Sequence, residues 1–365
     1  MTKQIKTIGI LTGGGDCPGL NAVIRAAVLT ASNDYGWIMV GFLDGFEGLM
    51  DERYINLTPK SVRGILPQGG TILGSSNKGN PFEWRVKEDG ELRTVDRSEK
   101  AVETLNGLGI DALIAIGGDG TMAVTKIFMD RYDIKAIGVP KTIDNDLKAT
   151  EVTFGFATAV VTATEAIDKL HTTAASHHRA MVLEVMGRYV GWIALESGVA
   201  GGADVILIPE IPYDIDIVCD KIMRRRSRGS NFSIVVIAEG AREKGGDVTL
   251  LNPELKGTIH EKLGGVGIRI AHQIEEKTGM ETRATVLGHL QRGGSPCSFD
   301  RYLGTRLGKA AVDLVHDEGF GRMICYRGGQ ITSMPIADAI GGFKAVDPAG
   351  ESVKTAESLG VSFGR

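Results

Sequence analysis

Glycine-rich clusters follow six short apolar runs, and this pattern constrains the fold more than any other feature of the sequence. The chain holds 50 glycines in 365 residues, close to twice the usual ~7%. They follow no collagen-like period. The runs with their clusters are TIGILTGGGD, ALIAIGGDG, KAIGVPKTIDND, AMVLEVMGRYVG, SIVVIAEGA and TRATVLGHLQRGG. Short apolar runs without clean alternation are typical of parallel strands buried on both faces.

Helical patterns lie between these runs, so strand and helix alternate along the chain. Four of them are NAVIRAAVLTASN, EKAVETLNGLG, FATAVVTATEAIDKLHTTAA and GVGIRIAHQIEEKTG. This alternation predicts an α/β fold of doubly wound, mainly parallel sheets, and 365 residues suffice for two domains. Such sheets bind ligands outside the carboxyl ends of their strands, where the glycine clusters lie. The segments FLDGFEGLMDERYINL and NKGNPFEWRVKEDGELRTVD are expected to be loops and edge structure.

Composition and charge favour a protein that acts on small molecules. A net charge of −4 provides no field that would hold nucleic acid or an anionic membrane. The four cysteines are far apart and form no CxxC pair, so they indicate neither a zinc site nor a disulfide framework. The first apolar run is broken by glycines after a few residues, too early for a signal peptide or a membrane span. We therefore expect a cytoplasmic protein without nucleic-acid or membrane partners.

The first cluster, LTGGGDCPGLNAVIRAA, is expected to run from strand through turn to helix. Unpaired backbone N–H groups and the positive end of a helix dipole would then face the turn and attract an anion. The cluster lacks the GxxxxGK[ST] of a Walker A loop and the GxGxxG dinucleotide fingerprint. Alone, it does not distinguish a nucleotide site from a tight turn that requires glycine.

The cluster GGDGT places a carboxylate among glycines, which have no side chain to cover the backbone. Gly117, Gly118 and Gly120 permit close approach of a ligand, and Asp119 offers a hard oxygen of the kind that Mg²⁺ prefers. An Asx-rich turn that caps a helix is the structural alternative.

The cluster KTIDND adds a lysine, a threonine and two more carboxylates. An extended segment would place Thr142, Asp144 and Asp146 on one face and Lys141 on the other, whereas a turn within the segment would alter this arrangement. Two carboxylates can divide the work, one near a metal and one near a hydroxyl proton. Together with GGDGT, this cluster predicts a site for phosphate and metal.

The second half of the chain supplies cations. Arg179 and Arg188 flank one predicted strand, and Arg283, His289 and Arg292 lie on and after another. Guanidinium groups suit phosphate oxygens, and neighbouring glycines let the backbone approach the same ligand. This pattern predicts a sugar-phosphate site, although each arginine alone could be a surface ion pair and His289 a structural histidine.

Six motifs, spread over residues 11–296, resemble those of 6-phosphofructokinase in content and order. They are LTGGGDCPGLNAVIR, GGDGT, PKTIDNDL, EVMGRYVG, IAEG and ATVLGHLQRGGSP. The resemblance implies the phosphofructokinase fold, with a donor (ATP) domain of residues 1–155 and 291–341 and a fructose 6-phosphate domain of residues 156–290 and 342–365. It also implies Mg²⁺ as cofactor and a homo-oligomer, a tetramer of D₂ symmetry, with active sites shared between subunits.

The same resemblance implies a role for each matching residue. Asp144 would take the proton from the sugar 1-hydroxyl, and Thr142 and Asp146 would support the transferring phosphoryl group and the metal. Arg188 would be a further catalytic residue, and Asp119 would lie close to Mg²⁺. The donor would be bound by Gly15, Asn77, Lys78, Gly117, Gly118, Asp119, Gly120, Thr121 and Lys141. The sugar phosphate would be bound by Thr142, Asp144, Met186, Gly187, Arg188, Glu239, His289 and Arg292, and by Arg179 and Arg283 of a neighbouring subunit.

The chain also departs from the bacterial pattern. Where many bacterial ATP enzymes have an arginine after GSA, this chain reads LGSSNKGNP, with Asn77 and Lys78. Two basic residues match the bacterial effector site, Arg25 and Arg228, whereas His171 and Ser230 are changed. Regulation by the usual effectors therefore does not follow. The basic stretch at 224–230 is expected to be a solvated face, with an anionic effector contact as the alternative.

The phosphoryl donor depends on two positions. In the resembled family, two small residues accompany many ATP enzymes, and aspartate with lysine accompanies pyrophosphate enzymes. Gly120 with Lys141 is a mixed pair that resembles plant-like ATP enzymes, so ATP is predicted and pyrophosphate remains the alternative. More remote alternatives are a dinucleotide-dependent oxidoreductase, whose fingerprint is missing, and a noncatalytic sugar-phosphate sensor, which intact Asp119 and Asp144 disfavour.

Overall fold

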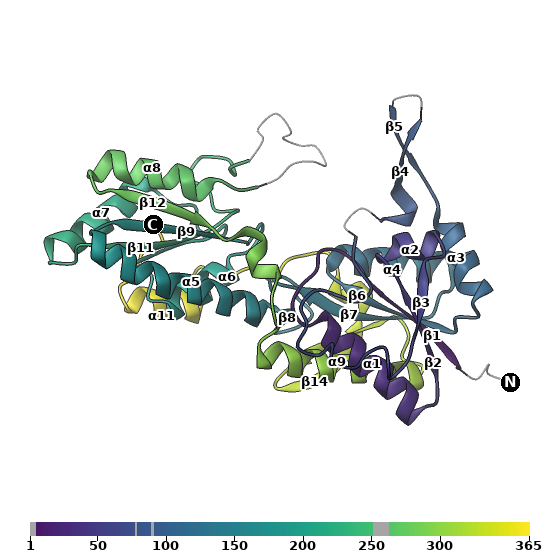
Figure 1. Cartoon of the computed structure of the whole chain (residues 1–365). Coiled ribbons are helices and arrows are strands. Elements are labelled where there is room, and N and C mark those ends of the chain that lie inside the picture. The colour runs from purple at the N-terminus through teal and green to yellow at the C-terminus, as the bar shows by residue number, and fades with distance from the viewer. Residues whose placement is uncertain (1–4, 77–78, 89–90, 251–262) are drawn as a thin grey trace. The chain divides into compact units, whose positions relative to one another are not determined.

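The computed structural model describes residues 5–76, 79–88, 91–250 and 263–365. The chain divides into two compact units: unit 1 is Met1–Ala157 with Arg292–Gly342, and unit 2 is Thr158–Gln291 with Phe343–Arg365. Each unit is built on a mainly parallel sheet with helices packed against it (Figure 1). The predicted fold class is confirmed, because alternating strands and helices form these layers.

The sheet of unit 1 has eight strands, seven of them in the order β14-β13-β7-β6-β1-β2-β3. The strands are β1 (Thr7–Thr12), β2 (Ile38–Phe42), β3 (Tyr54–Leu57), β6 (Ala112–Gly117), β7 (Ala136–Thr142), β8 (Phe154–Gly155), β13 (Arg322–Arg327) and β14 (Gln330–Pro335). Only β3 and β14 pair antiparallel within the described sheet. The register aligns Thr12 with Ile116 and Gly117 with Pro140. The carboxyl ends of β1, β6 and β7 therefore meet at one edge.

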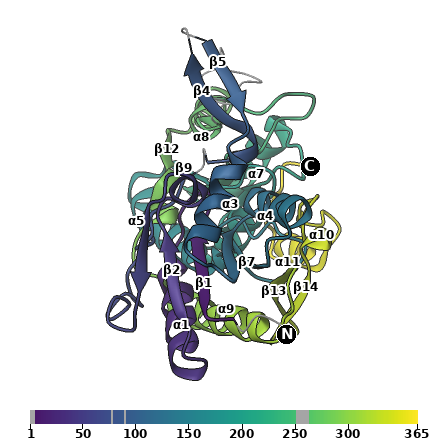
Figure 2. The same cartoon turned by 90° about the vertical axis from the view of Figure 1, so that its right-hand side faces the viewer.

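Helices cover both faces of this sheet (Figures 1 and 2). The helices are α1 (Leu20–Asp34), α2 (Phe46–Met50), α3 (Ser98–Gly107), α4 (Asp119–Tyr132), α9 (Ser298–His316) and α10 (Ile336–Ala339). On one face α2, α3 and α4 pack around Phe42, Leu113 and Phe128. On the other face α1 packs against α9. This helix contact requires glycine, because a Cβ on Gly308 would fall 2.3 Å from the carbonyl oxygen of Val23.

An antiparallel pair, β4 (Trp84–Glu88) and β5 (Glu91–Val95), stands out from unit 1 (Figures 1 and 2). It follows a short 3₁₀ helix, η1 (Pro81–Glu83). The sequence predicted loop and edge structure for this segment, and β4 and β5 are a correction to that prediction. Trp84 explains the difference, since it pairs with Val95, packs against the core of unit 1 and lies 5.1 Å from the Arg97 guanidinium.

Unit 2 contains a four-stranded, all-parallel sheet in the order β10-β11-β9-β12. The strands are β9 (Ala180–Val185), β10 (Val205–Leu207), β11 (Ser233–Ala238) and β12 (Thr282–Val286). The helices are α5 (Phe156–His177), α6 (Trp192–Ala200), α7 (Ile215–Ser227), α8 (Val266–Thr278) and α11 (Glu351–Ser358). Val182 and Val235 pack with α7 and α8, and Leu183 and Val236 on the opposite face are also buried. The sheet is thus covered on both faces.

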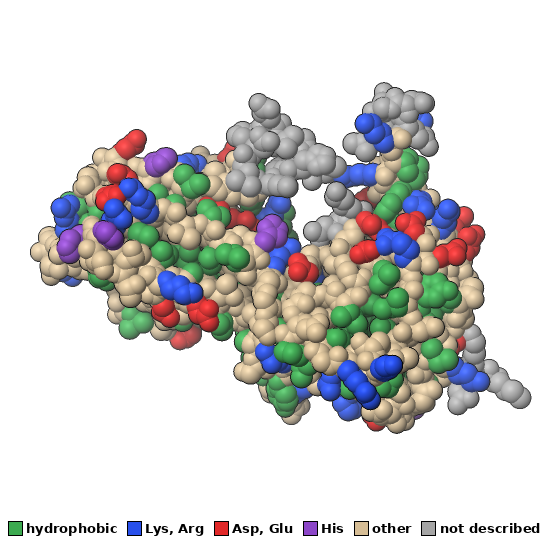
Figure 3. Space-filling view, viewed as in Figure 1, with side chains coloured by type: hydrophobic (Ala, Val, Ile, Leu, Met, Phe, Trp, Pro, Cys, Tyr) green, Lys and Arg blue, Asp and Glu red, His purple; other side chains and the backbone are tan. Residues whose placement is uncertain are grey.

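Charged side chains of both signs are interspersed on the surface shown in Figure 3, consistent with the small net charge. Within the described ranges, no helix has both the length and the apolar character that a membrane crossing requires.

Candidate active site

A cavity of about 370 Å³ lies in unit 1, where the carboxyl ends of β1, β6 and β7 meet. Its lining residues are Gly13, Gly14, Gly15, Asp16, Phe46, Ser76, Gly79, Asn80, Gly118, Asp119, Gly120, Thr121, Val124, Lys141, Thr142, Ile143, Asp144, Asp146 and Arg292. The three sequence clusters GGGD, GGDGT and KTIDND therefore come together, because their strands are neighbours in the sheet.

The start of α4 forms one wall of the cavity. Its N-cap, Gly118, has an extended backbone and no side-chain cap, so N–H groups of the first turn remain available to an anion. Gly117 ends β6 directly before it, and a Cβ there would fall 2.2 Å from the Thr121 hydroxyl. We predicted that the first cluster would offer the start of its own helix. Instead it contributes Gly13 to Asp16, whereas α1 begins at the fully buried Leu20.

Two cations meet at Gly15. The ammonium of Lys141 donates a hydrogen bond to the Gly15 carbonyl, and a Cβ on Gly15 would fall 2.1 Å from Nη1 of Arg292. Lys141 is only 5% exposed. Burial lowers the pKa of Lys141, and the charge of Arg292 lowers it further, while nearby Cys17 and the acidic residues of the cavity oppose this shift. The hydrogen-bond acceptor of Lys141 is a neutral carbonyl, and a bound phosphate would favour the protonated lysine.

The chain bends after β7, so that Lys141 at the end of this strand and the carboxylates that follow it line the same cavity. Asn145 adopts a left-handed backbone with φ 54°, and its side-chain oxygen accepts the Thr153 N–H at 3.2 Å. The Asp144 N–H donates to the Thr142 hydroxyl at 3.1 Å. The structure has the turn and not the extended arrangement of these two alternatives, because β7 ends at Thr142 and the chain bends after it, so that Lys141 and Asp144 line the same cavity.

Two carboxylates could hold a divalent metal. Burial raises the pKa of Asp146, and the negative charge of Asp119 raises it further, so the two carboxylates interact electrostatically. Asp119 also accepts the Gly341 N–H at 3.3 Å. Within the described residues, no group of three or more His, Cys, Asp or Glu is arranged to hold a metal. This donor set fits Mg²⁺, which takes one or two carboxylates and completes its shell with phosphate oxygens and water.

Sequence reasoning missed the apolar and amide part of the cavity wall. Phe46 opens α2, and Val124 lies one helical turn after Gly120 on α4. The helical spacing of Val124 was a usable signal, whereas Phe46 lines the cavity only through the chain path after β2. Ser76, Gly79 and Asn80 also line it. The predicted donor residues Asn77 and Lys78 lie outside the described residues.

Five of the predicted sugar-phosphate residues lie in unit 2 at the carboxyl ends of three adjacent strands. Met186, Gly187 and Arg188 follow β9, Glu239 follows β11, and His289 lies in the 3₁₀ helix η3 (Gly288–Arg292) after β12. The Glu239 N–H donates to the Val185 carbonyl at 2.9 Å, and the Gly240 N–H donates to the Gly187 carbonyl at 3.1 Å. Strand adjacency and these bonds hold the turn after β9 against the end of β11.

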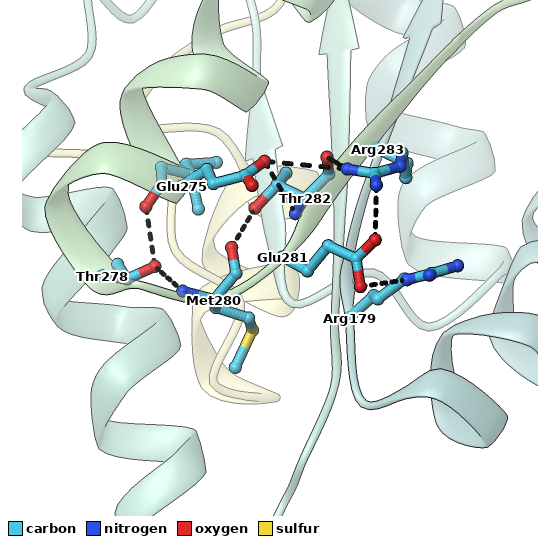
Figure 4. Close-up of polar contacts among 8 residues, drawn as sticks. Arg179, Glu275, Thr278, Met280, Glu281, Thr282 and Arg283 are labelled. Atoms are coloured by element: carbon cyan, nitrogen blue, oxygen red, sulfur yellow. Dashed lines mark hydrogen bonds and ion pairs between the residues drawn. The ribbon is translucent and has the colours of Figure 1, made fainter.

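The other two predicted arginines lie at the opposite edge of the same sheet. Arg179 directly precedes β9, and Arg283 is the second residue of β12. Glu281 joins them, with its Oε2 2.8 Å from Nε of Arg179 and its Oε1 bonded to Arg283 (Figure 4). A six-residue strand spans roughly 20 Å, so Arg188 lies beyond the reach of this pair. The structure does not bring these predicted residues together within one chain.

Residues 7–315 match the family described as phosphofructokinase. The chain belongs to the phosphofructokinase family. It is 51% identical, over the full length of both chains, to the ATP-dependent 6-phosphofructokinase 2 of Clostridium perfringens (strain 13 / Type A). Phosphofructokinase from Saccharomyces cerevisiae superposes with a TM-score of 0.79 at 30% identity; the match covers 92% of this chain and 44% of that longer chain. The resemblance drawn from the motifs is confirmed.

The relatives in this phosphofructokinase family are named for two different phosphoryl donors, ATP and pyrophosphate. A pyrophosphate–fructose 6-phosphate 1-phosphotransferase from Streptomyces coelicolor is 53% identical over 98% of this chain and 99% of its own. Its identity to this chain is close to that of the Clostridium enzyme named for ATP. The choice of donor is therefore best argued from individual residues of the cavity.

Proposed function

We propose that this phosphofructokinase-family chain transfers the γ-phosphoryl group of ATP to the 1-hydroxyl of fructose 6-phosphate and forms fructose 1,6-bisphosphate and ADP. The observation that carries the proposal is the cavity at the ends of β1, β6 and β7. There, Lys141 and Arg292 meet at Gly15, while Asp119, Asp144 and Asp146 line the same space. Cations, helix N–H groups and carboxylates in one cavity suit phosphoryl transfer between oxygen atoms.

In this proposal the residues mostly position oxygens and neutralise charge. Phosphoryl transfer proceeds through a loose, in-line transition state, whose charge spreads over the equatorial oxygens. Lys141, Arg292 and the N–H groups at the start of α4 bind those oxygens. Asp144 accepts the proton of the 1-hydroxyl, and a modest base suffices because that proton leaves late. Thr142 holds the Asp144 backbone in place through its hydroxyl.

Mg²⁺ is the metal that the acidic residues of the cavity fit best. Asp119 and Asp146 would hold it together with donor phosphates and water. When bound, Mg²⁺ neutralises phosphate charge and orients the transferring group. Burial raises the pKa of Asp146, and the charge of Asp119 raises it further; a bound cation would relieve the repulsion between the two carboxylates.

ATP is the proposed donor because the cavity has room and an apolar wall beyond the phosphate-binding residues. A Cβ on Gly120 would meet no atom within 4 Å, so the path past the start of α4 is open. Phe46 and Val124 add apolar surface, which a nucleoside needs and pyrophosphate does not. Pyrophosphate is the second candidate, favoured by the buried Lys141 and by the relative named for that donor.

We also propose that unit 1 binds the donor, that unit 2 binds the sugar phosphate, and that the active enzyme is a homo-oligomer, a D₂ tetramer. Arg179 and Arg283 support the shared site, because they lie at the sheet edge opposite Arg188 and yet converge on one carboxylate, Glu281. Two guanidinium groups that already share one anionic partner are suited to hold a phosphate supplied from another subunit.

A coupled assay for fructose 1,6-bisphosphate, run in parallel with ATP and with pyrophosphate, tests the proposal. With ATP, Asp144→Asn should lower kcat by ~10² to 10⁴, while the KM for fructose 6-phosphate changes little. Asp130→Asn is the control, because this exposed carboxylate on α4 pairs only with Lys126 among the described residues. Product from pyrophosphate but none from ATP would overturn the donor, and wild-type turnover by Asp144→Asn would overturn the base.

A further inference from the structure

Gln291 is a fully buried amide that bonds the turn after β9. It belongs to η3, is 0% exposed, and its side-chain oxygen accepts the Met186 N–H at 2.8 Å. The bond fixes the orientation of the amide, since only its oxygen can accept from an N–H group. The side-chain nitrogen of Gln291 finds no hydrogen-bond partner among the described residues.

The turn Met186–Arg188 is held at three points. Two are backbone bonds from the β11 side, Glu239 N–H to Val185 and Gly240 N–H to Gly187. The bond from Gln291 to Met186, unlike these two, depends on a side chain. Gly187 has φ 144°, and a Cβ there would fall 2.7 Å from the Val190 carbonyl oxygen. The turn is therefore tight, and losing one of its bonds should let it move.

The same bond sets the position of η3. This short helix contains His289, two residues before Gln291. Between β12 and η3, the Leu287 N–H donates a hydrogen bond to the Glu184 carbonyl of β9 at 3.0 Å. An interaction that joins Met186 to Gln291 thus fixes Arg188 relative to His289. Those side chains belong to the proposed sugar-phosphate site.

We propose that Gln291 is a positioning residue of the sugar-phosphate site, which holds the turn Met186–Arg188 against η3 through its side-chain carbonyl. This inference rests on the proposed function, because it assumes that the turn contacts fructose 6-phosphate. Stability alone does not account for an amide at this position. Methionine has nearly the same shape, and Gln291→Met would exchange one unpaired buried group, the amide nitrogen, for another, the Met186 N–H.

Gln291→Met is the decisive variant. Loss of the acceptor should raise the KM for fructose 6-phosphate about tenfold, with the KM for ATP unchanged within experimental error. Amide hydrogen exchange at Met186 should become faster. Gln291→Glu keeps an acceptor for the Met186 N–H, so it should restore slow exchange at Met186, whereas its negative charge near the sugar phosphate should keep the KM for fructose 6-phosphate high. The matched control is Gln273→Met in the same unit, which loses one amide bond, to Glu243 at 3.4 Å, and should change neither KM.

A wild-type KM for the sugar in Gln291→Met, or an equal rise in both KM values, would overturn the inference. So would Gln291→Glu with exchange as fast as in Gln291→Met. If Gln291→Met does not fold, Gln291→Asn provides the same comparison. The asparagine side chain is one methylene shorter, so its carbonyl no longer reaches the Met186 N–H. The exchange measurement needs no turnover. A wild-type protein that forms no bisphosphate therefore refutes the proposed function, whereas unchanged exchange in the variants refutes the role of Gln291.

Discussion

Gly120 is the residue whose replacement tests the choice of donor most directly. It is the second residue of α4 and lines the cavity, and a Cβ built on it meets no atom within 4 Å. Gly120→Ala and Gly120→Asp should therefore both fold. Replacing glycine in a helix stabilises it by about 0.5–1 kcal/mol, and an acidic residue in the first turn adds about 0.3–1 kcal/mol. Both variants should melt at or above the wild-type temperature.

Donor binding should separate the two variants. The aspartate side chain would point into the open space of the cavity and bring one negative charge near the donor phosphates. At about 6 Å and an effective dielectric constant of ~20, two unit charges repel by about 3 kcal/mol. That corresponds to a loss of about 100-fold in affinity. Gly120→Ala adds a methyl group without charge and should change the KM for ATP by less than about threefold.

The assay is the initial rate of fructose 1,6-bisphosphate formation at saturating fructose 6-phosphate, with ATP or pyrophosphate varied at constant free Mg²⁺. Gly120→Asp should need about 100-fold more ATP than Gly120→Ala. Equal KM values for ATP in the two variants would refute the electrostatic argument. If Gly120→Ala raised the KM for ATP as much as Gly120→Asp does, the space at this position, rather than charge, would limit ATP binding.

Two further predictions concern assembly and pH. Inactive Arg283→Ala and inactive Asp144→Asn subunits, mixed and reassembled, should regain part of the activity if active sites are shared, and mixed oligomers that stay inactive would contradict sharing. The pKa of Asp146 is raised above its ordinary 3.8 mainly by burial, so its neutral form is favoured in the folded protein, and its contribution to stability is lost as pH rises through the folded pKa. Urea unfolding at several pH values should therefore show Asp146→Asn gaining stability relative to wild type as the pH rises above about 3.8, whereas a difference independent of pH would count against this burial effect.

Local patterns in the sequence were sufficient for the strands that end in glycine clusters and for most of the residues that line the cavity of unit 1. All six apolar runs that end in glycine clusters are strands, namely β1, β6, β7, β9, β11 and β12, and the four helical patterns correspond to α1, α3, α5 and α8. All residues of GGGD, GGDGT and KTIDND except Gly117 and Asn145 line one cavity. These features were predictable because strand propensity, glycine turns and carboxyl-end clusters depend on a few consecutive residues.

Which side chains face one another was decided by the tertiary structure. Lys141 lines the same cavity as Asp144 because β7 ends at Thr142 and the chain bends at residues 143–144. Arg179 precedes β9 and Arg188 follows it, so the two arginines lie at opposite ends of this strand. A strand of six residues separates its ends by roughly 20 Å. Phe46 reaches the cavity through the path of the chain after β2, and Gln291 meets Met186 through the pairing of β12 with β9. Such contacts depend on strand order, register and turn geometry, which arise from interactions between residues far apart in the sequence.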